Sequence, residues 1–179
     1  MSSSDVTTAL SILPPLDSHN QLNFLRSKYD KAYPRWMPHI NLLFPFVSED
    51  KFDEVEKNLS EVLSTTTSFA IFLDHVNGFS QGKGNMTYHY APSDDSNLQN
   101  LYKVVRKAIP DFKPQKDIFA AHMTVAQTTK QSESVVLEEI KKELGDGFGF
   151  PVDRIYILQR SKTDGKEPFH IAREIFLKE

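Results

Sequence analysis

Two hydrophobic segments of the chain repeat one unusual pattern, and this repetition constrains the fold more than any other feature. Residues 38–46 read PHINLLFPF, and residues 119–127 read FAAHMTVAQ. Each segment has the apolar content of a buried strand, yet each also carries a titratable imidazole. Packing alone does not require such a group in a buried strand, so the two histidines are candidates for chemistry.

Alternation along a strand places each histidine beside a short polar residue. Successive side chains of a strand point to opposite faces, so residues two apart share a face. His39 therefore shares a face with Asn41, and His122 shares a face with Thr124. We expect each strand to present one imidazole and one hydrogen-bond donor on the same side.

The elements around the two segments also repeat. Helical spacing of apolar residues and turn signals predict a strand, a helix and two further strands in each half. The predicted ranges are 38–46, 48–64, 69–78 and 86–90 in the first half, and 119–127, 132–144, 154–158 and 170–177 in the second. A strand at 9–13, helices at 17–33 and 96–109, and a polar loop at 110–117 complete the order. Residues 1–7 are small and polar, and we expect them to form a flexible tail.

This order predicts an α+β fold with two similar lobes. The length of 179 residues fits one domain, so we expect a single domain of two intertwined lobes spanning 1–179. If a pseudo-twofold axis relates the lobes, their antiparallel or mixed sheets face a central cleft and the helices lie outside. The two histidines and the two donors would then surround one volume.

The composition excludes several classes of function. The formal net charge is −3 at pH 7, so any nucleic-acid partner must be held by a local site rather than by a basic face. The chain has no cysteine, which excludes disulfides, thiol catalysis and cysteine-based zinc sites. No apolar run is long enough to span a bilayer, and no signal peptide is visible. We therefore expect a cytoplasmic or nuclear location.

Two imidazoles and two donors around one volume suit the cleavage of a phosphodiester. A base must take a proton from water and an acid must protonate the departing oxygen, and imidazole serves in either role near neutral pH. The non-bridging oxygens of the phosphate gain charge in the transition state and need fixed donors. The Asn41 amide and the Thr124 hydroxyl supply them, and we expect no metal or other cofactor to be required.

The two motifs resemble the pattern of the two-histidine (2H) phosphoesterases, the LigT-like or RNA 2',3'-cyclic phosphodiesterase-like family. The family pattern is two copies of His-x-Thr/Ser-hydrophobic, and the copies in this chain are HINL at 39–42 and HMTV at 122–125. The resemblance covers nearly the whole chain, because VDRIYILQRS at 152–161 is similar to the C-terminal strand of the family. It implies a bilobal fold with a central cleft and metal-independent cleavage of cyclic or 2'-5' phosphate linkages.

The first motif departs from the family pattern, because Asn41 stands where threonine or serine is usual. An amide still donates an N–H to a phosphate oxygen, so we expect function to survive. The sequence does not determine how Asn41 changes the rate or the geometry of the bound substrate. The resemblance favours His122 as the base and His39 as the acid, but the sequence alone does not order them.

Three further residues are candidates for substrate binding. Trp36 either stacks on a nucleobase or covers the hydrophobic core, and the sequence does not separate these roles. Arg35 and Tyr88 are candidates for the mouth of the predicted cleft. A solvated loop is the simpler interpretation for Arg35, and sheet packing is the simpler one for Tyr88. Zinc coordination is the alternative to acid–base catalysis for the two histidines. A catalytic zinc site commonly has three protein ligands, and no acidic residue accompanies either motif on its face.

These observations predict an enzyme that hydrolyses a nucleoside or RNA-terminal 2',3'-cyclic phosphate by acid–base catalysis with His39 and His122. One alternative is a 2'-5' oligonucleotide phosphodiesterase. Another is a non-catalytic nucleotide-binding or RNA-binding module on the same fold, which Asn41 favours. The expected partner is a nucleotide or an RNA end, with no membrane and no metal, and we expect the chain to act as a monomer.

Overall fold

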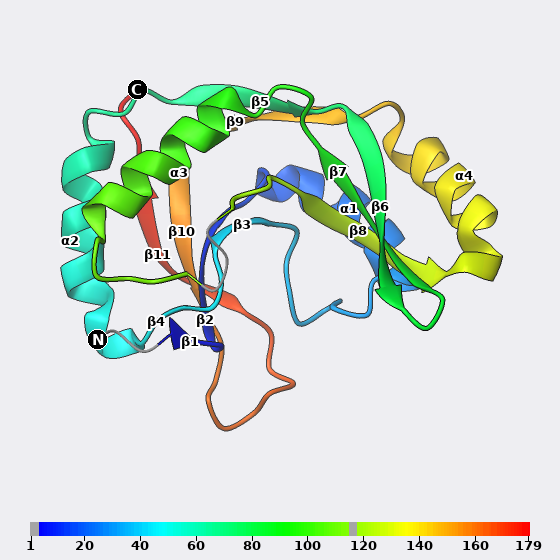
Figure 1. The fold of residues 1–179 in the computed structure, drawn as a ribbon, viewed down its shortest axis with the longest axis horizontal. Coiled ribbons are helices and arrows are strands. Elements are labelled where there is room, and N and C mark those ends of the chain that lie inside the picture. Colours follow the sequence, from blue (N-terminus) through cyan, green and yellow to red (C-terminus); the bar gives the residue numbers. More distant parts are fainter. Residues whose placement is uncertain (1–3, 115–117) are drawn as a thin grey trace.

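The structure is a computed structural model that describes residues 4–114 and 118–179. These residues form four α-helices, labelled in Figure 1: α1 (Leu16–Tyr29), α2 (Phe52–Leu63), α3 (Ser96–Ala108) and α4 (Glu133–Leu144). The strands are β1 (Ser4–Asp5), β2 (Thr8–Ile12), β3 (Ile40–Leu43), β4 (Phe46–Val47), β5 (Phe69–Leu73), β6 (His75–Gly82), β7 (Asn85–Ala91), β8 (Met123–Thr129), β9 (Phe148–Val152), β10 (Arg154–Gln159) and β11 (His170–Phe176). The predicted α+β fold class is confirmed.

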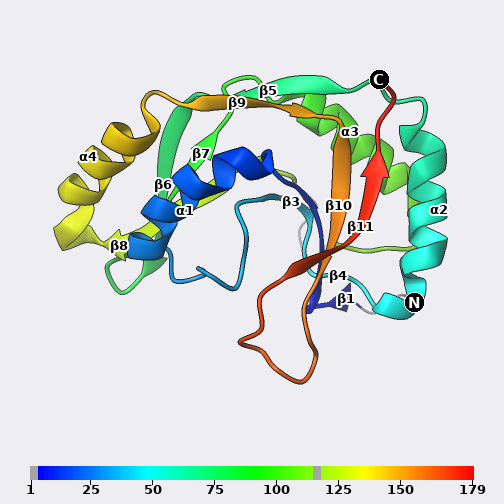
Figure 2. The ribbon, with the colours of Figure 1, turned by 180° about the vertical axis from the view of Figure 1, so that it is seen from behind.

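Two antiparallel sheets form the two lobes. One sheet has four strands in the order β11-β10-β2-β3, and the other has three strands in the order β6-β7-β8. The strands β5 and β9 pair with each other as an antiparallel ribbon. In Figures 1 and 2 this ribbon runs along the top of the molecule, with one lobe on each side. The short strands β1 and β4 form a separate pair.

The two halves of the chain exchange their hairpins. The hairpin β6–β7 belongs to the first half, but β7 pairs with β8 of the second half. The hairpin β10–β11 belongs to the second half, and β10 pairs with β2, which in turn pairs with β3 of the first half. Each histidine motif therefore shares a sheet with the hairpin of the other half, so neither half completes its sheet alone.

The repeated order of elements extends beyond the predicted pattern. In each half a helix leads to the histidine motif, and a short 3-10 turn (Glu49–Lys51 or Lys130–Ser132) precedes the next helix. A strand of the β5–β9 ribbon then leads into the hairpin. The duplication is not complete, because β2 lies between β3 and β10 whereas β7 and β8 pair directly. The two lobes are therefore similar but not equal.

Helices cover one face of each sheet and bury a core that both lobes share. α2 packs against β11 and α3, and α1 and α4 pack against β8; Figure 2 shows α1 in front of β8. The buried residues of α2 recur every three or four positions, as on one face of a helix; they are Phe52, Val55, Leu59 and Leu63. In the described ranges, no helix combines the length and the apolarity needed to cross a membrane.

A second, smaller hydrophobic cluster lies on the other face of the four-stranded sheet. In β2, Leu10 belongs to the main core and its neighbour Ala9 belongs to the small cluster, as expected for alternating faces. Phe169 joins Ala9 in the small cluster, and Trp36 and Met37 pack against it. The segment before β3 and the segment before β11 therefore meet on this face.

The predicted strand 38–46 starts later than expected and is interrupted. β3 ends at Leu43, and β4 begins at Phe46. Pro45 lies between them, and proline has no N–H to donate to a neighbouring strand. His39 and His122 each stand one residue before their strand, at the point where the chain enters the sheet.

Strand boundaries on either side of the ribbon also differ from expectation. The predicted strand 69–78 is two strands, β5 and β6, which belong to different sheets. β9 has no counterpart among the predicted strands, because Gly147, Gly149 and Pro151 are residues typical of turns. Its pairing with β5, far away in the sequence, makes this segment a strand.

Part of the segment expected to be a flexible tail, residues 1–7, takes part in a strand pairing. Ser4 and Asp5 pair with Val47 and Phe46. The Asp5 carboxylate also accepts a hydrogen bond of 2.8 Å from the backbone N–H of Thr7. Residues 1–3 lie outside the described residues, as do residues 115–117 of the predicted loop 110–117.

Gly147 occupies a position where a side chain is not tolerated. Its φ is +136°, and an added Cβ would lie 2.1 Å from the carbonyl oxygen of Leu73. We predict that Gly147→Ala lowers the free energy of unfolding by roughly 1–3 kcal/mol or more, measured by urea denaturation. Gly165 is the control, because a Cβ there meets nothing within 4 Å. Equal losses in Gly147→Ala and Gly165→Ala would contradict the prediction.

Candidate functional site

His39 and His122 are held by the same local contact. Nδ1 of His39 lies 2.7 Å from the carbonyl oxygen of Met37, and Nδ1 of His122 lies 2.7 Å from that of Ala120. Each imidazole thus bonds to the residue two positions before it. A carbonyl oxygen only accepts hydrogen bonds, so Nδ1 carries a proton in both rings. In the neutral form, Nε2 of each ring then keeps its lone pair for other partners.

The two equivalent histidines lie in different surroundings. Burial lowers the pKa of His39 to about 4, and nearby positive charges on Arg26 and His122 act in the same direction. His39 and His122 are therefore close enough to influence each other. His122 itself is exposed. At pH 7 the imidazole of His39 is neutral and largely covered by the protein, while that of His122 is open to water.

An aromatic stack encloses His39. The Trp36 ring stacks on His39 with centroids 4.5 Å apart, and on Phe169 with centroids 3.8 Å apart. Two rings at these separations would collide on one face of the indole, so they lie on opposite faces. The Arg160 guanidinium continues the stack, 5.0 Å from the Phe169 centroid. Both faces of Trp36 are therefore occupied, and of the two roles considered for this residue the structure shows the cover over hydrophobic side chains.

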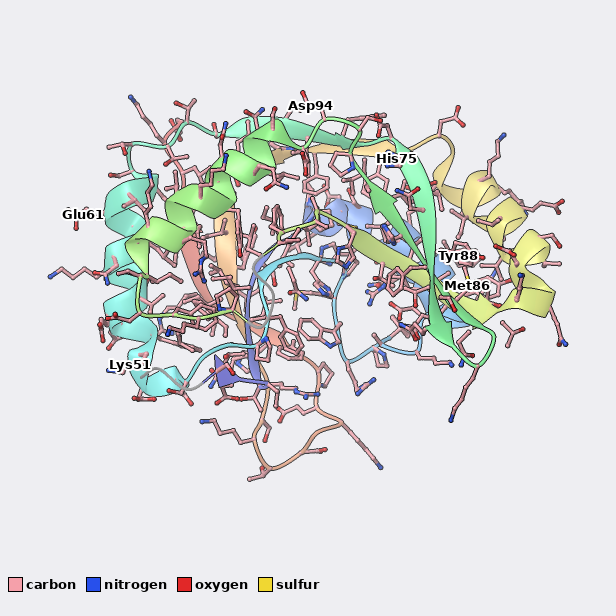
Figure 3. The ribbon with its side chains drawn as sticks, in the orientation of Figure 1. Lys51, Glu61, His75, Met86, Tyr88 and Asp94 are labelled. Atoms are coloured by element: carbon pink, nitrogen blue, oxygen red, sulfur yellow. The ribbon has the colours of Figure 1, made fainter. Side chains whose placement is uncertain are left out.

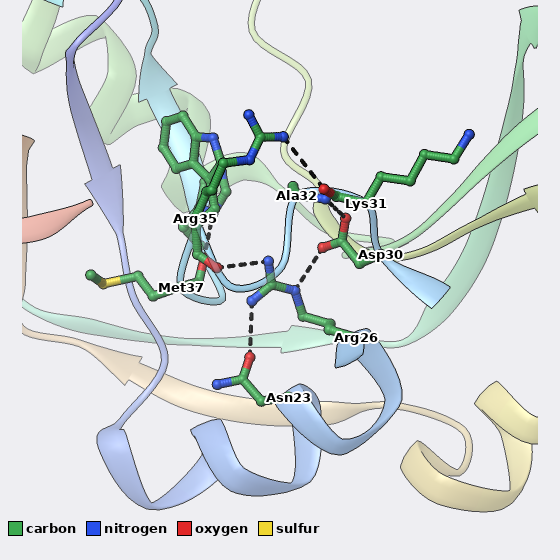
Figure 4. A network of polar contacts seen from close by, with 9 residues as sticks. Asn23, Arg26, Asp30, Lys31, Ala32, Arg35 and Met37 are labelled. Carbon is green, nitrogen blue, oxygen red and sulfur yellow. Dashed lines mark hydrogen bonds and ion pairs between the residues drawn. The ribbon is translucent and has the colours of Figure 1, made fainter. Parts of the chain in front are cut away.

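A buried ion pair fixes the irregular segment that carries Trp36 and His39. Arg26 Nε lies 2.8 Å from Asp30 Oδ2, and their side chains are 2% and 1% exposed. Figure 4 shows that Arg26 also donates to the Asn23 side chain at 3.0 Å and to the Trp36 carbonyl at 2.9 Å. Because a buried charge is costly without partners, this set of bonds favours one arrangement of the segment. The network takes the place of regular secondary structure just before β3.

Asn41 is oriented by a buried serine. Ser11 is fully buried, and its hydroxyl donates a hydrogen bond of 2.7 Å to Asn41 Oδ1. The register of β2 and β3 pairs these two residues. Because the amide oxygen is engaged, the NH₂ group of Asn41 is the part left to donate on the face shared with His39. This orientation supports the predicted donor role.

Thr124 lies beside a third histidine. Thr124 of β8 pairs with His89 of β7, and cross-strand partners share a face of the sheet. The rings of His89 and His122 are 5.2 Å apart at an interplanar angle of 67°. Burial lowers the pKa of His89 to about 4, and charges on His122 and His75 add to this effect. The neutral imidazole of His89 therefore contacts the exposed ring of His122.

The remaining sequence candidates lie differently from the histidines. Tyr88, labelled in Figure 3, is 3% exposed, and its hydroxyl lies 2.5 Å from a carboxylate oxygen of Glu133 on α4. It therefore points to the helix-covered face of β7, and its predicted substrate contact is replaced by sheet packing. Arg35 is exposed, and its guanidinium lies 3.4 Å from the Lys31 carbonyl oxygen, which fits the solvated loop considered for it.

His39 and His122 line neither of two cavities in the part of the chain that the structure describes. The larger, of about 650 Å³, lies between α2 and the segment that follows α3 and includes Lys51 in its lining. The smaller, of about 260 Å³, lies between β6 and α4. Across residues 4–114 and 118–179, no group of three or more histidine and acidic side chains is placed to hold a metal ion.

Two residues of the site were not among the sequence candidates. Ser11 gives no signal in the sequence, because its role depends on the register between β2 and β3. His89 does give one, since it alternates with Tyr88 and Tyr90 in a predicted strand. Those tyrosines are buried, and alternation then assigns His89 to the opposite face.

The lowered pKa values of His39 and His89 link stability to pH. Both lie at about 4 in the folded chain, against a reference of 6.5, so the unfolded chain binds protons first as pH falls. The stability is present above pH 6.5 and is lost as pH falls towards 4. We predict that His89→Gln loses less stability than the wild type between these limits, measured by urea midpoints. Parallel losses in the two proteins would contradict this.

Solved structures share this architecture. Escherichia coli LigT in its apo form matches with a TM-score of 0.66 at 15% sequence identity, over 99% of this chain and 100% of LigT. The protein TT0787 of Thermus thermophilus matches with a TM-score of 0.61 at 14% identity, over 96% of this chain and 97% of that protein. At these identities the likeness is one of fold.

Sequence relatives cover most of the chain. A protein of Bacillus mycoides named as a phosphoesterase is 24% identical over 169 residues, which are 91% of this chain and 95% of the relative. A protein of Oceanobacillus iheyensis with the same kind of name is 27% identical over 153 residues, 83% of this chain and 86% of the relative. Residues 14–164 match the family described as the 2'-5' RNA ligase superfamily, and this range contains both histidine motifs. The chain belongs to the 2'-5' RNA ligase superfamily, the family of two-histidine phosphoesterases that its motifs resemble.

Proposed function

We propose that the protein is a metal-independent phosphodiesterase that hydrolyses a nucleoside or RNA-terminal 2',3'-cyclic phosphate. The observation that carries the proposal is the matched pair of imidazoles. His39 and His122 each bond a backbone carbonyl through Nδ1 and leave Nε2 for proton transfer. Hydrolysis of a phosphodiester needs two such groups, one to accept a proton and one to donate it. Membership of the family supports phosphoesterase activity in general.

The proposed reaction is a single displacement at phosphorus. One imidazole takes a proton from water at Nε2 as the water oxygen attacks phosphorus. The bond from phosphorus to one ribose oxygen breaks, and the other imidazole gives its Nε2 proton to that oxygen. The product is a nucleoside monophosphate with one free ribose hydroxyl, and proton exchange with solvent restores both histidines.

The surroundings of the two rings favour His39 as the base and His122 as the acid. Burial holds the pKa of His39 at about 4, so its neutral form is present at pH 7. His122 is exposed, and we assign the remaining role, that of the acid, to it. This order reverses the preference taken from the resemblance and rests on the unequal burial of the two rings.

Asn41 and Thr124 are assigned to the phosphate oxygens. They come from the two different sheets and share a face with His39 and His122, respectively. Ser11 holds the Asn41 amide with its NH₂ group available. Donors that are fixed in advance stabilise the charge that develops on the non-bridging oxygens, and loss of one such donor typically slows catalysis about 10²–10³-fold.

The substrate class is supported by the fold neighbours. Structures of Escherichia coli LigT have been solved with 3'-AMP and with ATP. A nucleoside 3'-phosphate is one of the two products that opening of a 2',3'-cyclic phosphate gives. The family name points to a 2'-5' linkage as the second candidate, and its cleavage would use the same two proton transfers.

We predict that His39→Ala and His122→Ala each reduce kcat by about 10²–10⁴-fold, because each removes one proton transfer. Product formation from adenosine 2',3'-cyclic phosphate measures kcat, and calorimetric binding of 3'-AMP is expected to persist in both variants. His170→Ala is a matched control, since His170 is exposed on β11. We also expect wild-type activity to persist in EDTA.

Unchanged hydrolysis by His122→Ala would refute the enzymatic role of the pair. A wild-type protein that binds 3'-AMP but opens neither cyclic phosphates nor 2'-5' dinucleotides would instead support the non-catalytic binding module. Complete loss of activity in EDTA would contradict metal independence.

The stack around His39 leads to a prediction about pH. Burial is the largest cause of the low pKa of His39, and Trp36 covers one face of its ring. Trp36→Leu admits water to that face, so we predict that the acidic limb of the kcat/KM profile moves from about 4 towards 6.5. Profiles of the two proteins between about pH 3.5 and 8 measure the shift. An unmoved limb would show that Trp36 does not control the basicity of His39.

A further inference from the structure

His89 of β7 lies beside the proposed site, and the reaction with two histidines gives it no role. The hydroxyl of its neighbour Tyr88 lies 2.5 Å from a carboxylate oxygen of Glu133, the first residue of α4. The hydroxyl of its other neighbour, Tyr90, donates a hydrogen bond of 2.9 Å to the carbonyl oxygen of Gly145, which follows α4. Both tyrosines therefore point to the helix-covered face of β7, and alternation along the strand places the imidazole of His89 on the opposite face.

On this open face His89 contacts both residues of the second histidine motif. It pairs across the strands with Thr124, and directly opposed residues on one face of a sheet have Cβ atoms about 4.5–5.5 Å apart. Its ring lies against the ring of His122, with centroids 5.2 Å apart and an interplanar angle of 67°. A phosphate that is bound by both His122 and Thr124 therefore lies beside the side chain of His89.

The hydrogen bonding of the His89 ring points to a partner outside the chain. Among the described residues, Nδ1 of His89 is buried and has no hydrogen-bond partner, although the residue as a whole is only partly buried. Buried polar groups in native proteins are nearly always bonded, so such an exception indicates a functional position. A neutral imidazole carries one proton. Because Nδ1 has no acceptor, the proton is better placed on Nε2, which lies farther from the backbone.

The charge state of His89 suits a hydrogen-bond donor rather than a second acid. Burial lowers its pKa to about 4, and charges on His122 and His75 act in the same direction. At pH 7 the ring is therefore neutral, and a neutral imidazole still donates one N–H. It adds no positive charge beside His122, where a second cation would disfavour the protonated form that an acid needs.

We propose that His89 is a further catalytic residue, which donates its Nε2–H to a non-bridging oxygen of the phosphate held between His39 and His122. The proposal rests on the proposed function, and it adds a third donor to Asn41 and Thr124. The proton stays on Nε2 throughout, and no covalent bond to the ring forms or breaks. A donor fixed in this position stabilises the negative charge that develops on the phosphate oxygens in the transition state.

Two substitutions of His89 separate donation from packing. His89→Gln keeps an N–H donor, whereas His89→Phe keeps a flat ring against His122 and donates nothing. We expect His89→Phe to lower kcat/KM for adenosine 2',3'-cyclic phosphate by about 10- to 150-fold, and His89→Gln to keep most of the rate. The reverse order would show that His89 only packs against His122, and it would overturn the proposal. His75→Phe is the matched control, because His75 lies on β6 and its Nδ1 is 2.9 Å from Asp74.

Replacement of one phosphate oxygen by sulfur tests the contact itself. The two diastereomers of adenosine 2',3'-cyclic phosphorothioate each carry sulfur at one of the two non-bridging positions, and sulfur is a weak hydrogen-bond acceptor. Only the wild type has the His89 donor at one of these positions. We therefore expect the ratio of kcat/KM for the two diastereomers to change in His89→Phe. The same ratio in the two proteins would contradict a direct contact.

A titration without turnover distinguishes failure of this proposal from failure of the proposed function. Nitrogen NMR of the wild-type imidazoles follows His89 during addition of 3'-AMP, and the signals of His89 are identified by their absence in His89→Gln. We expect 3'-AMP to shift the Nε2 resonance of His89, and adenosine, which has no phosphate, to leave it unmoved. If the wild type opens no cyclic phosphate, the proposed function fails, and the titration still decides whether His89 meets a phosphate. A resonance that 3'-AMP leaves unmoved would overturn the proposal.

Discussion

Backbone pairing between the two halves of the chain is the constraint on which the remaining structure depends. The hydrogen bonds of β7 with β8, and of β10 with β2, join strands from opposite halves. His39 and His122 stand at the points where the chain enters these sheets. Their relative position is therefore set by sheet register and by the β5–β9 ribbon rather than by a flexible linker. A site on rigid elements keeps its reacting groups in place, which proton transfer requires.

Identical local geometry does not make the two histidines equal. Both use Nδ1 on the carbonyl two residues earlier, but only His39 lies under an indole ring. The buried guanidinium of Arg26 stabilises this arrangement, because it donates a hydrogen bond to the carbonyl oxygen of Trp36. A shared motif thus supplies two rings with Nδ1 protonated, and burial lowers the pKa of His39. Acid and base are distinguished by their surroundings rather than by residue type.

The parts of the site that could be predicted from the sequence depend on local rules. Alternation along a strand pairs His39 with Asn41 and His122 with Thr124, and the repeated order of elements indicates two lobes. These inferences need only neighbouring residues. The match of these residues to a known pattern came from the resemblance, which also indicated the family that the chain belongs to.

Features that depend on distant contacts were not predicted. β9 is a strand only because β5 pairs with it, and the hairpins are exchanged because of pairings between the two halves. Trp36 was an open choice in the sequence, since Phe169, which occupies its second face, lies near the other end of the chain.

Neither half of the chain completes its sheet without a strand of the other half. A chain with only one half would have a histidine strand with an open edge and a hairpin without a neighbour, and open edges invite pairing with another chain. Two copies that swapped hairpins would satisfy both needs as a symmetric dimer, with one imidazole from each subunit at the axis. In such a dimer every substitution appears twice, so both rings must stay alike. A single polypeptide has no such restriction: β2 lies in one sheet only, and an indole ring stacks on His39.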